Sequence, residues 1–307
     1  MEYSVRKYLA FLKTAEHKSF TRAAEALSCS QSGISRMIHD VEEELGFSLL
    51  SRNCSGVRLT AEGEKILPKI RELSIAFENI QNQAEEIRGI ESGMIRIGTF
   101  SSVATHWLPN IIRKFQQDYP YIDYEFLLGD YQEIEQWIAD GRVDLGFLKI
   151  PAAKGLDAAA LEQDKLMVIL PENHPLAGCK KFPIARLCDE PFILLEKEKC
   201  AEISELFAEH HLTPKVHFTT WDDYAVMSMV ESGMGIGILP QLILKRIPYR
   251  IIAKELDVAA SRVIGVALRS RKDASPAVKK FLEYLSYRNS EIQDITNSEK
   301  VSAEGET

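Results

Sequence analysis

A short run of small polar and basic side chains near the N-terminus has the chemistry needed to hydrogen-bond DNA. Gln31, Ser32 and Ser35 lie close together in the sequence. A Gln amide can form two hydrogen bonds with adenine, and a Ser hydroxyl can pair with several bases. Arg36 follows directly and could reach a guanine or a phosphate. These residue types predict recognition of base edges.

Three short helices must position these side chains. Apolar periodicity predicts helices over residues 5–17, 20–27 and about 30–45. Ser19 and Ser30 precede the second and third helices as N-caps, because a Ser hydroxyl can accept a hydrogen bond from a free backbone amide of the first turn. The third helix therefore begins just before the polar run.

The third helix has one apolar face and one polar face. Helical spacing places Ile34, Ile38, Val41 and Leu45 on the same side, and the polar side chains on the other. Two helices joined by a tight turn at Ser28, the second with an outward polar face, are typical of a helix-turn-helix. The alternative is a helical bundle with a solvated polar face.

Further side chains could contact the DNA backbone. Residues 49–60 predict a β-hairpin wing with its turn at Gly56, and such a wing after the helices favours the DNA-binding interpretation. The predicted phosphate contacts are Thr21, Arg22 and Ser30 around the second and third helices, and Arg52 and Arg58 in the wing.

A long amphipathic helix follows the wing. Residues 61–89 carry an apolar seam at alternating spacings of four and three, which is typical of a coiled coil. The seam consists of Ile66, Ile70, Leu73, Phe77, Ile80, Ala84 and Ile87. Pairing with a second copy would place two recognition helices on two half-sites of an inverted repeat. The alternative is burial of the seam against its own chain.

The rest of the chain alternates predicted strands and helices. Over residues 90–288 this pattern indicates an α/β fold with mainly parallel sheets, arranged as two subdomains around a ligand-binding cleft. The second subdomain is expected over about 164–266. Residues 289–307 contain few large apolar side chains and predict a disordered tail.

Composition narrows the function classes. The chain has 307 residues, is 45% hydrophobic, and carries a net charge of −8. No apolar run is long enough to cross a membrane, and no export signal is visible at the start. Five cysteines without a CxxC pair argue against a disulfide scaffold or a zinc site, so we expect a cytoplasmic protein. No nucleophile–base pair or nucleotide-binding motif predicts catalysis, and we expect no cofactor, metal or membrane partner.

The N-terminal motifs resemble the DNA-binding domain of LysR-type transcriptional regulators. The resemblance rests on the runs at 19–27, 30–36, 42–46 and 59–63, together with Arg52. The body is similar to that family's effector-binding domain, which looks like a type 2 periplasmic binding protein. Its matching pieces are Ile95–Gly98, Leu108-Pro109, Gly141–Leu145, His174–Ala177, Val230–Pro240 and Ser275–Ala277. Leu50, where the family usually has Phe, and Cys54-Ser55, where it commonly has a basic residue, depart from the pattern.

The resemblance implies a regulator that binds double-stranded DNA as a homodimer or homotetramer, responds to a small-molecule effector and controls the access of RNA polymerase. Residues at predicted strand ends would line the effector cleft, namely Thr99, Ser101, Ser102, Asp130, Tyr131, Phe147, Cys200 and Trp221. The family often binds organic anions, and the hydroxyls after the first strand could hold a carboxylate. Asp130 and Glu133 would repel an anion, so an amine-bearing or neutral effector stays open. A redox switch at Cys200 and a pure solute-binding module stay open as well.

Overall fold

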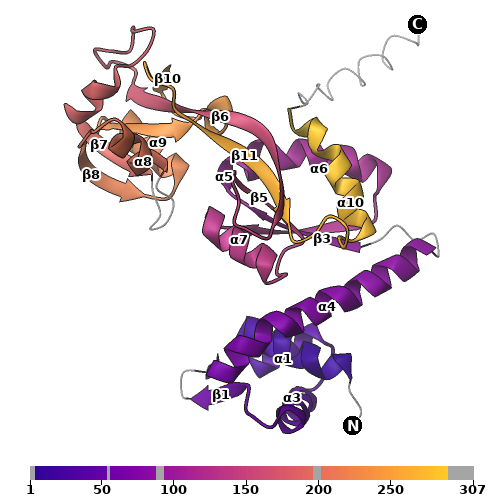
Figure 1. Cartoon of the computed structure of the whole chain (residues 1–307). Helices are drawn as coiled ribbons and strands as arrows, with labels where there is room; N and C mark the ends of the chain where they lie inside the picture. The colour runs from indigo at the N-terminus through magenta and orange to yellow at the C-terminus, as the bar shows by residue number, and fades with distance from the viewer. Residues whose placement is uncertain (1–3, 54–55, 88–92, 196–201, 290–307) are drawn as a thin grey trace, which may run out of the picture. The chain divides into compact units, whose positions relative to one another are not determined.

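The computed structural model describes residues 4–53, 56–87, 93–195 and 202–289 (Figure 1). The chain forms two compact units. One consists of Met1–Ile90 with Trp137–Val143, and the other of Glu91–Gln136 with Asp144–Thr307. After the roles that the sequence predicts for them, we refer to them as the DNA-binding unit and the effector unit. Among the described residues, no helix is both long and apolar enough to span a membrane. The predicted tail beyond residue 289 and Cys200 lie outside the described residues.

The DNA-binding unit has the predicted helix-turn-helix and wing, although Gly56, predicted at the turn of the wing, is the first residue of its second strand and pairs with Asn53. Its elements are α1 (Val5–His17), α2 (Phe20–Ala26), α3 (Gln31–Leu45), β1 (Leu50–Asn53), β2 (Gly56–Leu59) and α4 (Ala61–Ile87). Ser19 Oγ accepts a hydrogen bond from the Arg22 amide, and Ser30 Oγ accepts one from the Gly33 amide at 3.1 Å. Both predicted N-caps are therefore confirmed. Gly46 ends α3 with φ +80°, a conformation that favours glycine.

The predicted apolar face of α3 forms the centre of this unit's core. Ile34, Ile38 and Val41 are buried, and they pack with side chains of α1 and α2 such as Phe11 and Ala23. Small side chains on α2 allow the helices to approach closely. Each helix is too short to be stable alone, so this shared core holds the recognition helix in place.

The effector unit contains one mixed sheet and several helices. Its strands are β3 (Gly93–Thr99), β4 (Ile122–Leu128), β5 (Leu145–Lys149), β6 (Asp157–Pro171), β7 (Pro191–Leu195), β8 (Lys215–Thr220), β9 (Ile236–Pro240), β10 (Ile251–Glu255) and β11 (Ser261–Leu268). Its α-helices are α5 (Ser101–His106), α6 (Leu108–Asp118), α8 (Glu202–Glu209), α9 (Asp223–Glu231), α10 (Pro276–Glu283) and the part of α7 (Tyr131–Ala139) that precedes Trp137. Short 3-10 helices lie at Ile184–Cys188, Ile243–Lys245 and Tyr284–Asn289. The described strands run in the order β4-β3-β5-β11-β6-β9-β7-β8, and β10 also pairs with β6.

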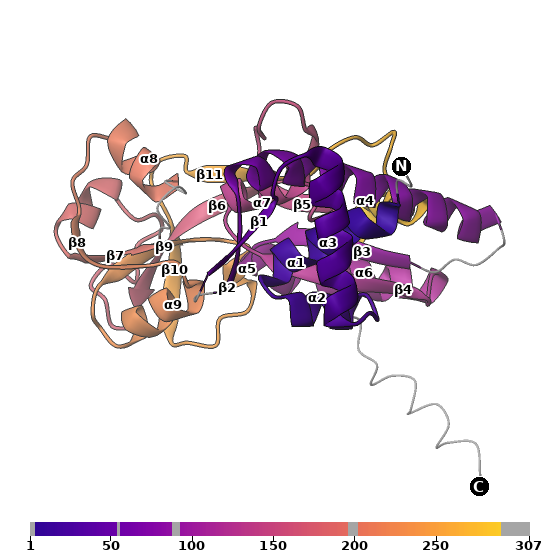
Figure 2. The same ribbon diagram turned by 90° about the horizontal axis from the view of Figure 1, so that it is seen from below.

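The strand order divides the effector unit into two lobes. Lobe one contains β3, β4, β5 and β11, and its core includes Trp107 and Phe115. Lobe two contains β7, β8, β9 and β10, and its core includes Phe192 and Phe207. Figure 2 shows β3 and β4 at one end of this unit, and β7, β8 and β9 at the other. Each lobe has its own core, as expected for two subdomains around a cleft.

One long strand belongs to both lobes. The first part of β6 pairs with β11, from Asp157↔Leu268 to Lys165↔Ser261, and the last part pairs with β9 and β10. β6 and β11 run side by side as a ribbon between the lobes (Figure 1). The sequence predicted mainly parallel sheets. The structure differs here because the chain enters lobe two along β6 and returns along β11, so these strands must be antiparallel.

Candidate functional site

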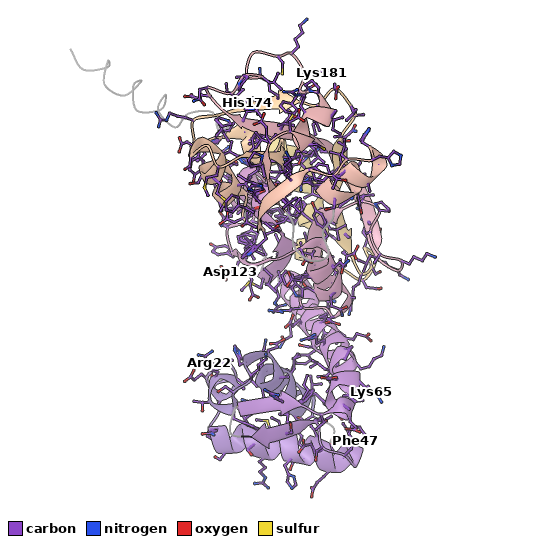
Figure 3. The ribbon with its side chains drawn as sticks, turned by 90° about the vertical axis from the view of Figure 1, so that its left-hand side faces the viewer. Arg22, Phe47, Lys65, Asp123, His174 and Lys181 are labelled. Carbon is purple, nitrogen blue, oxygen red and sulfur yellow. The ribbon has the colours of Figure 1, made fainter. Side chains whose placement is uncertain are left out.

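The candidate DNA interface is the outward face of α3 with the start of α2. Gln31, Ser32 and Arg36 are exposed, whereas Ser35 is half-buried. Thr21 and Arg22 are exposed on α2, and Figure 3 shows the Arg22 side chain at the surface of this unit. Ser30 Oγ lies 3.1 Å from Ser32 Oγ, in addition to capping the helix. Of the predicted base-reading and phosphate-contacting residues on α2 and α3, all but Ser35 are therefore exposed.

The wing is tied to the recognition helix by a carboxylate. Glu42 Oε1 on α3 accepts hydrogen bonds from the backbone amides of Leu49 and Leu50, at 2.7 and 3.1 Å. In β2, Arg58 is exposed and pairs across the hairpin with Ser51. Arg52 lies on the facing strand β1 opposite Val57. Glu42 thus fixes where the wing begins relative to α3.

Two further acidic residues of α3 are paired with a lysine of α1. Lys7 Nζ of α1 lies 3.1 Å from Asp40 and 3.3 Å from Glu44. The hydrogen bond from Lys7 to Asp40 raises the pKa of Lys7, which keeps this ammonium group charged. These carboxylates are paired with a cation of the same unit, so the nearby basic side chains can attract phosphates.

The apolar seam of α4 is divided between two environments. Ile70 is buried in the core of the DNA-binding unit, and Ile66 is partly buried against that core. This first part of the seam follows the alternative of burial against its own chain. Leu73, Ile80 and Ile87 are 38%, 68% and 80% exposed. Phe77 and Ala84, which lie between them in the seam, are half-buried.

The candidate effector site is a cavity of about 300 Å³ lined by both lobes. This volume is at the lower end of the range for small-molecule sites. Lobe one contributes the start of α5 and the β4–α7 junction, and lobe two contributes the starts of α8 and α9. The lining residues are Phe100, Ser101, Leu128, Gly129, Asp130, Tyr131, Glu133, Leu166, Leu195, Glu202, Ile203, Trp221, Asp222, Asp223, Pro240 and Arg262.

A buried arginine forms part of the cavity wall. Arg262 of β11 donates from Nε and Nη2 to Asp164 Oδ2 at 3.0 and 2.8 Å. Its Nη1 donates to the Tyr131 hydroxyl at 2.7 Å, and Nη2 also donates to Ser102 Oγ at 3.0 Å. Burial alone would lower the pKa of Arg262, but Tyr131, Glu202 and Asp164 raise it above the usual value. Arg262 therefore stays charged and joins residues of several elements.

A second polar contact crosses the cleft. Ser101 Oγ, at the start of α5 in lobe one, donates a hydrogen bond to Asp223 Oδ2, at the start of α9 in lobe two. Asp223 is only 7% exposed. Burial raises the pKa of its carboxyl group, while the Ser101 hydroxyl and Arg262 act in the opposite direction. This contact holds the two lobes together at one side of the cavity.

The predicted effector residues are only partly brought together. Ser101, Asp130, Tyr131 and Trp221 line the cavity. Ser102 lies behind its wall as a partner of Arg262. Thr99 is fully buried, and its hydroxyl lies 3.4 Å from the Phe100 carbonyl oxygen. Phe147 does not line the cavity: it is fully buried and packs edge-to-face on Trp107 in the lobe-one core.

Sequence reasoning missed several residues of this site. Arg262, Glu202 and Asp223 line the cavity, and Asp164 holds Arg262. Arg262 carried a usable signal, because it is a charged residue at the beginning of an otherwise apolar strand. Asp223 and Glu202 look like ordinary first-turn acidic residues of helices, so their position in the cavity depends on the tertiary fold.

Comparison with known proteins identifies the family of both units. Residues 88–289 match the family model described as LysR substrate binding domain, and residues 5–64 match the bacterial regulatory helix-turn-helix protein model of the lysR family. The chain is 31% identical to the uncharacterized HTH-type transcriptional regulator YvbU of Bacillus subtilis (strain 168), over 91% of this chain and 97% of the relative. It is 33% identical to the probable HTH-type transcriptional regulator LrrA of Synechococcus elongatus, over 91% and 95% of the two chains.

A solved structure shows the same fold with DNA bound. Full-length CbnR in complex with its target DNA superposes with a TM-score of 0.66 at 22% identity, covering 93% of this chain and 100% of that one. YvbU and LrrA are both named as HTH-type transcriptional regulators, and neither name describes an enzyme. With a capped helix-turn-helix, a wing and a two-lobed effector unit, the chain belongs to the LysR family of bacterial transcriptional regulators.

Proposed function

We propose that this regulator reads an inverted-repeat DNA site as a homodimer or homotetramer. The observation that carries the proposal is the exposed part of the α4 seam. Leu73, Ile80 and Ile87 recur at heptad spacing on one helix and are largely exposed in a single chain. Packing against α4 of a second copy would remove this apolar surface from water. A two-fold dimer would then present two α3 helices to two half-sites.

We assign the roles by region. Residues 1–60 form the DNA-binding domain, 61–89 the dimerisation helix, and 90–288 the effector-binding domain, with its second subdomain over about 164–266. Gln31, Ser32, Ser35 and Arg36 read base edges, and Thr21, Arg22, Ser30, Arg52 and Arg58 contact phosphates. The exposure of Thr21, Arg22, Ser30, Gln31, Ser32, Arg36 and Arg58 supports this assignment. DNA binding implies that the protein works in the cytoplasm.

Effector binding in the cleft would change how the two lobes are arranged. The lobes are joined by the β6–β11 ribbon and by the Ser101–Asp223 hydrogen bond. An effector that binds one arrangement better than the other shifts the population toward it. In a dimer or tetramer, that shift would alter half-site spacing or DNA bending, and with it the access of RNA polymerase.

Selection of genomic fragments by the purified full-length protein tests this proposal. Bound fragments are sequenced, and the enriched sites are footprinted at moderate salt. We expect a common inverted repeat with protected half-sites separated by about one helical turn, roughly 10 base pairs, or a multiple of it. Binding that is weak, strongly salt-dependent and without a common sequence would contradict specific recognition.

A further inference from the structure

We propose that the effector of this regulator is a cation, specifically an amine-bearing or quaternary ammonium organic molecule. This inference rests on the proposed effector-binding role of the cleft and adds the chemical class of the ligand. Three properties of the cavity support it: its own carboxylates already occupy the helix N-termini, its arginine is already satisfied, and its remaining wall is aromatic and apolar.

The first property concerns the helix N-termini around the cavity, where an anion would otherwise bind. At the start of α7, Asp130 Oδ1 accepts a hydrogen bond from the Glu133 amide at 2.8 Å, and Glu133 Oε2 accepts one from the Asp130 amide at 3.0 Å. At the start of α9, Asp222 Oδ1 accepts a hydrogen bond from the Tyr224 amide at 2.9 Å. The protein's own carboxylates thus bond the amides that an anionic ligand would need.

The hydroxyl at the start of α5 is engaged in the same way. Ser101 Oγ donates a hydrogen bond to the Asp223 carboxylate of the opposite lobe. A ligand carboxylate could reach this hydroxyl only by displacing Asp223, and the two negative charges would then face each other in a poorly solvated space. A cation between them meets no such repulsion.

The second property concerns Arg262, the basic residue among the described lining residues. A guanidinium group has five N–H donors. Four of them are directed to Asp164, Tyr131 and Ser102. Glu202 Oε2 lies 3.8 Å from Nη1, on the side where the last donor remains. Arg262 is therefore neutralised and has no pair of donors with which to clamp a ligand carboxylate.

Glu202 adds an unused acceptor. Its Oε1 atom is buried and has no hydrogen-bond partner among the described residues. A buried carboxylate oxygen without a partner is costly, and an ammonium ligand could supply the missing donor. Together with Asp130, Glu133, Asp222 and Asp223, this makes five carboxylates and one guanidinium among the lining residues that the structure describes.

The third property is the aromatic part of the wall. Phe100, Tyr131 and Trp221 line the cavity, and Trp221 is 74% exposed in this structure. Aromatic faces attract ammonium groups, and the Arg262 guanidinium already lies 5.0 Å from the Phe100 ring centre. Leucine, isoleucine and proline side chains complete the lining. Carboxylates beside aromatic and apolar walls suit a small organic cation with an apolar part.

Matched ligand series provide the test. The melting temperature of the full-length protein is measured with 2-phenylethylamine, 1,4-diaminobutane and choline. Matched probes are 3-phenylpropanoate and hexanedioate as anions, and 3,3-dimethylbutan-1-ol as the neutral analogue of choline. At about 5 mM we expect at least one cation to raise the melting temperature by about 2 °C or more, and the anions and the alcohol to have no effect. Stabilisation by the anions, or by none of the cations, would overturn the proposal.

A pair of variants on one helix gives the matched control. Glu202→Gln should weaken binding of the active cation about tenfold or more, because it removes the charge and one acceptor. Glu205 lies one turn further along α8, pairs with Lys149 at 3.0 Å and does not line the cavity. The Glu205→Gln variant should therefore bind the cation as the parent protein does. Equal effects of the two variants would count against the cavity as the binding site.

Footprinting of both variants separates this inference from the function on which it rests. If the protein protects specific sites on DNA but responds to anions, only the charge class is wrong. If it protects no specific site under any condition, the regulator role itself is wrong, whatever the cavity binds.

Discussion

Arg262 and Asp164 form a buried ion pair between the two strands that join the lobes. The guanidinium of β11 contacts the carboxylate of β6 at 2.8 Å, and the side chains are 6% and 5% exposed. Asp164 Oδ1 also accepts a hydrogen bond from the Leu242 amide at 2.8 Å. The pair thus connects the ribbon to the start of α5 through Ser102, to α7 through Tyr131, and to the segment after β9.

Replacing the arginine should destabilise the effector unit strongly. Arg262→Met leaves the Asp164 carboxylate buried without its cation, which typically costs about 3–5 kcal/mol. For a unit of this size we expect the melting temperature to fall by about 10 °C. Differential scanning calorimetry of the full-length protein measures this. The double variant Arg262→Met/Asp164→Leu should recover part of the loss, and a single variant that melts like the parent would refute the argument.

Asp223 should make stability depend on pH. Because its pKa is raised in the folded chain, the folded state binds more protons than the unfolded state from about pH 4 up to that raised pKa. This contribution to stability is therefore lost as the pH rises through the window. Asp223→Asn removes the effect, so the variant should gain in melting temperature relative to the parent as the pH rises from about 4 to about 7.

Ser101→Ala should strengthen the pH dependence that Asp223→Asn removes. It removes the hydroxyl that favours the charged form of Asp223, so the loss of stability with rising pH should become steeper. Parallel pH profiles for the parent and both variants would show that this carboxyl group has no such role.

Two substitutions in the DNA-binding unit should separate base reading from phosphate contact. Gln31→Ala should weaken binding to the specific site by about 1–3 kcal/mol and leave binding to random DNA nearly unchanged. Arg58→Ala should weaken both and reduce the slope of log K against log salt by about 1. Fluorescence anisotropy titrations at several salt concentrations measure these effects, and identical losses for both variants on both DNAs would contradict the assignment.

The divided seam of α4 predicts two different outcomes on one helix. Ile80→Glu places a charge in the exposed part of the α4 seam, so it should shift the protein toward monomers without unfolding it. Ile70→Ala opens a cavity in the core of the DNA-binding unit and should lower its stability by about 2–5 kcal/mol. Light scattering and thermal melts distinguish these results. Gln81→Glu, on an exposed neighbour, is the control for Ile80→Glu.

The helix-turn-helix could be predicted almost completely, because its signals are local. Ser19, Ser30 and Gly46 set the helix ends through contacts within a few residues. The face of α3 follows from spacing alone. In α4 the same spacing covers both the buried Ile70 and the exposed Ile80, so periodicity identified the seam but not which part packs on its own chain.

The effector site was less predictable because its contacts are distant in sequence. Arg262 is 98 positions from Asp164 and 160 from Ser102. Strand ends were correctly located around Asp130 and Trp221, yet a position near a strand end did not show which way each side chain points. Phe147 illustrates this point, because it lies in a strand of lobe one but its side chain is buried in the core.

The continuity of β6 has a mechanical consequence. Because β6 is hydrogen-bonded to strands of both lobes, we expect a rotation of one lobe against the other to change the twist of the β6–β11 ribbon. Such a distortion is elastic, and it relaxes when the force that maintains it is removed. We therefore expect the two lobes to return to their resting arrangement when a ligand dissociates.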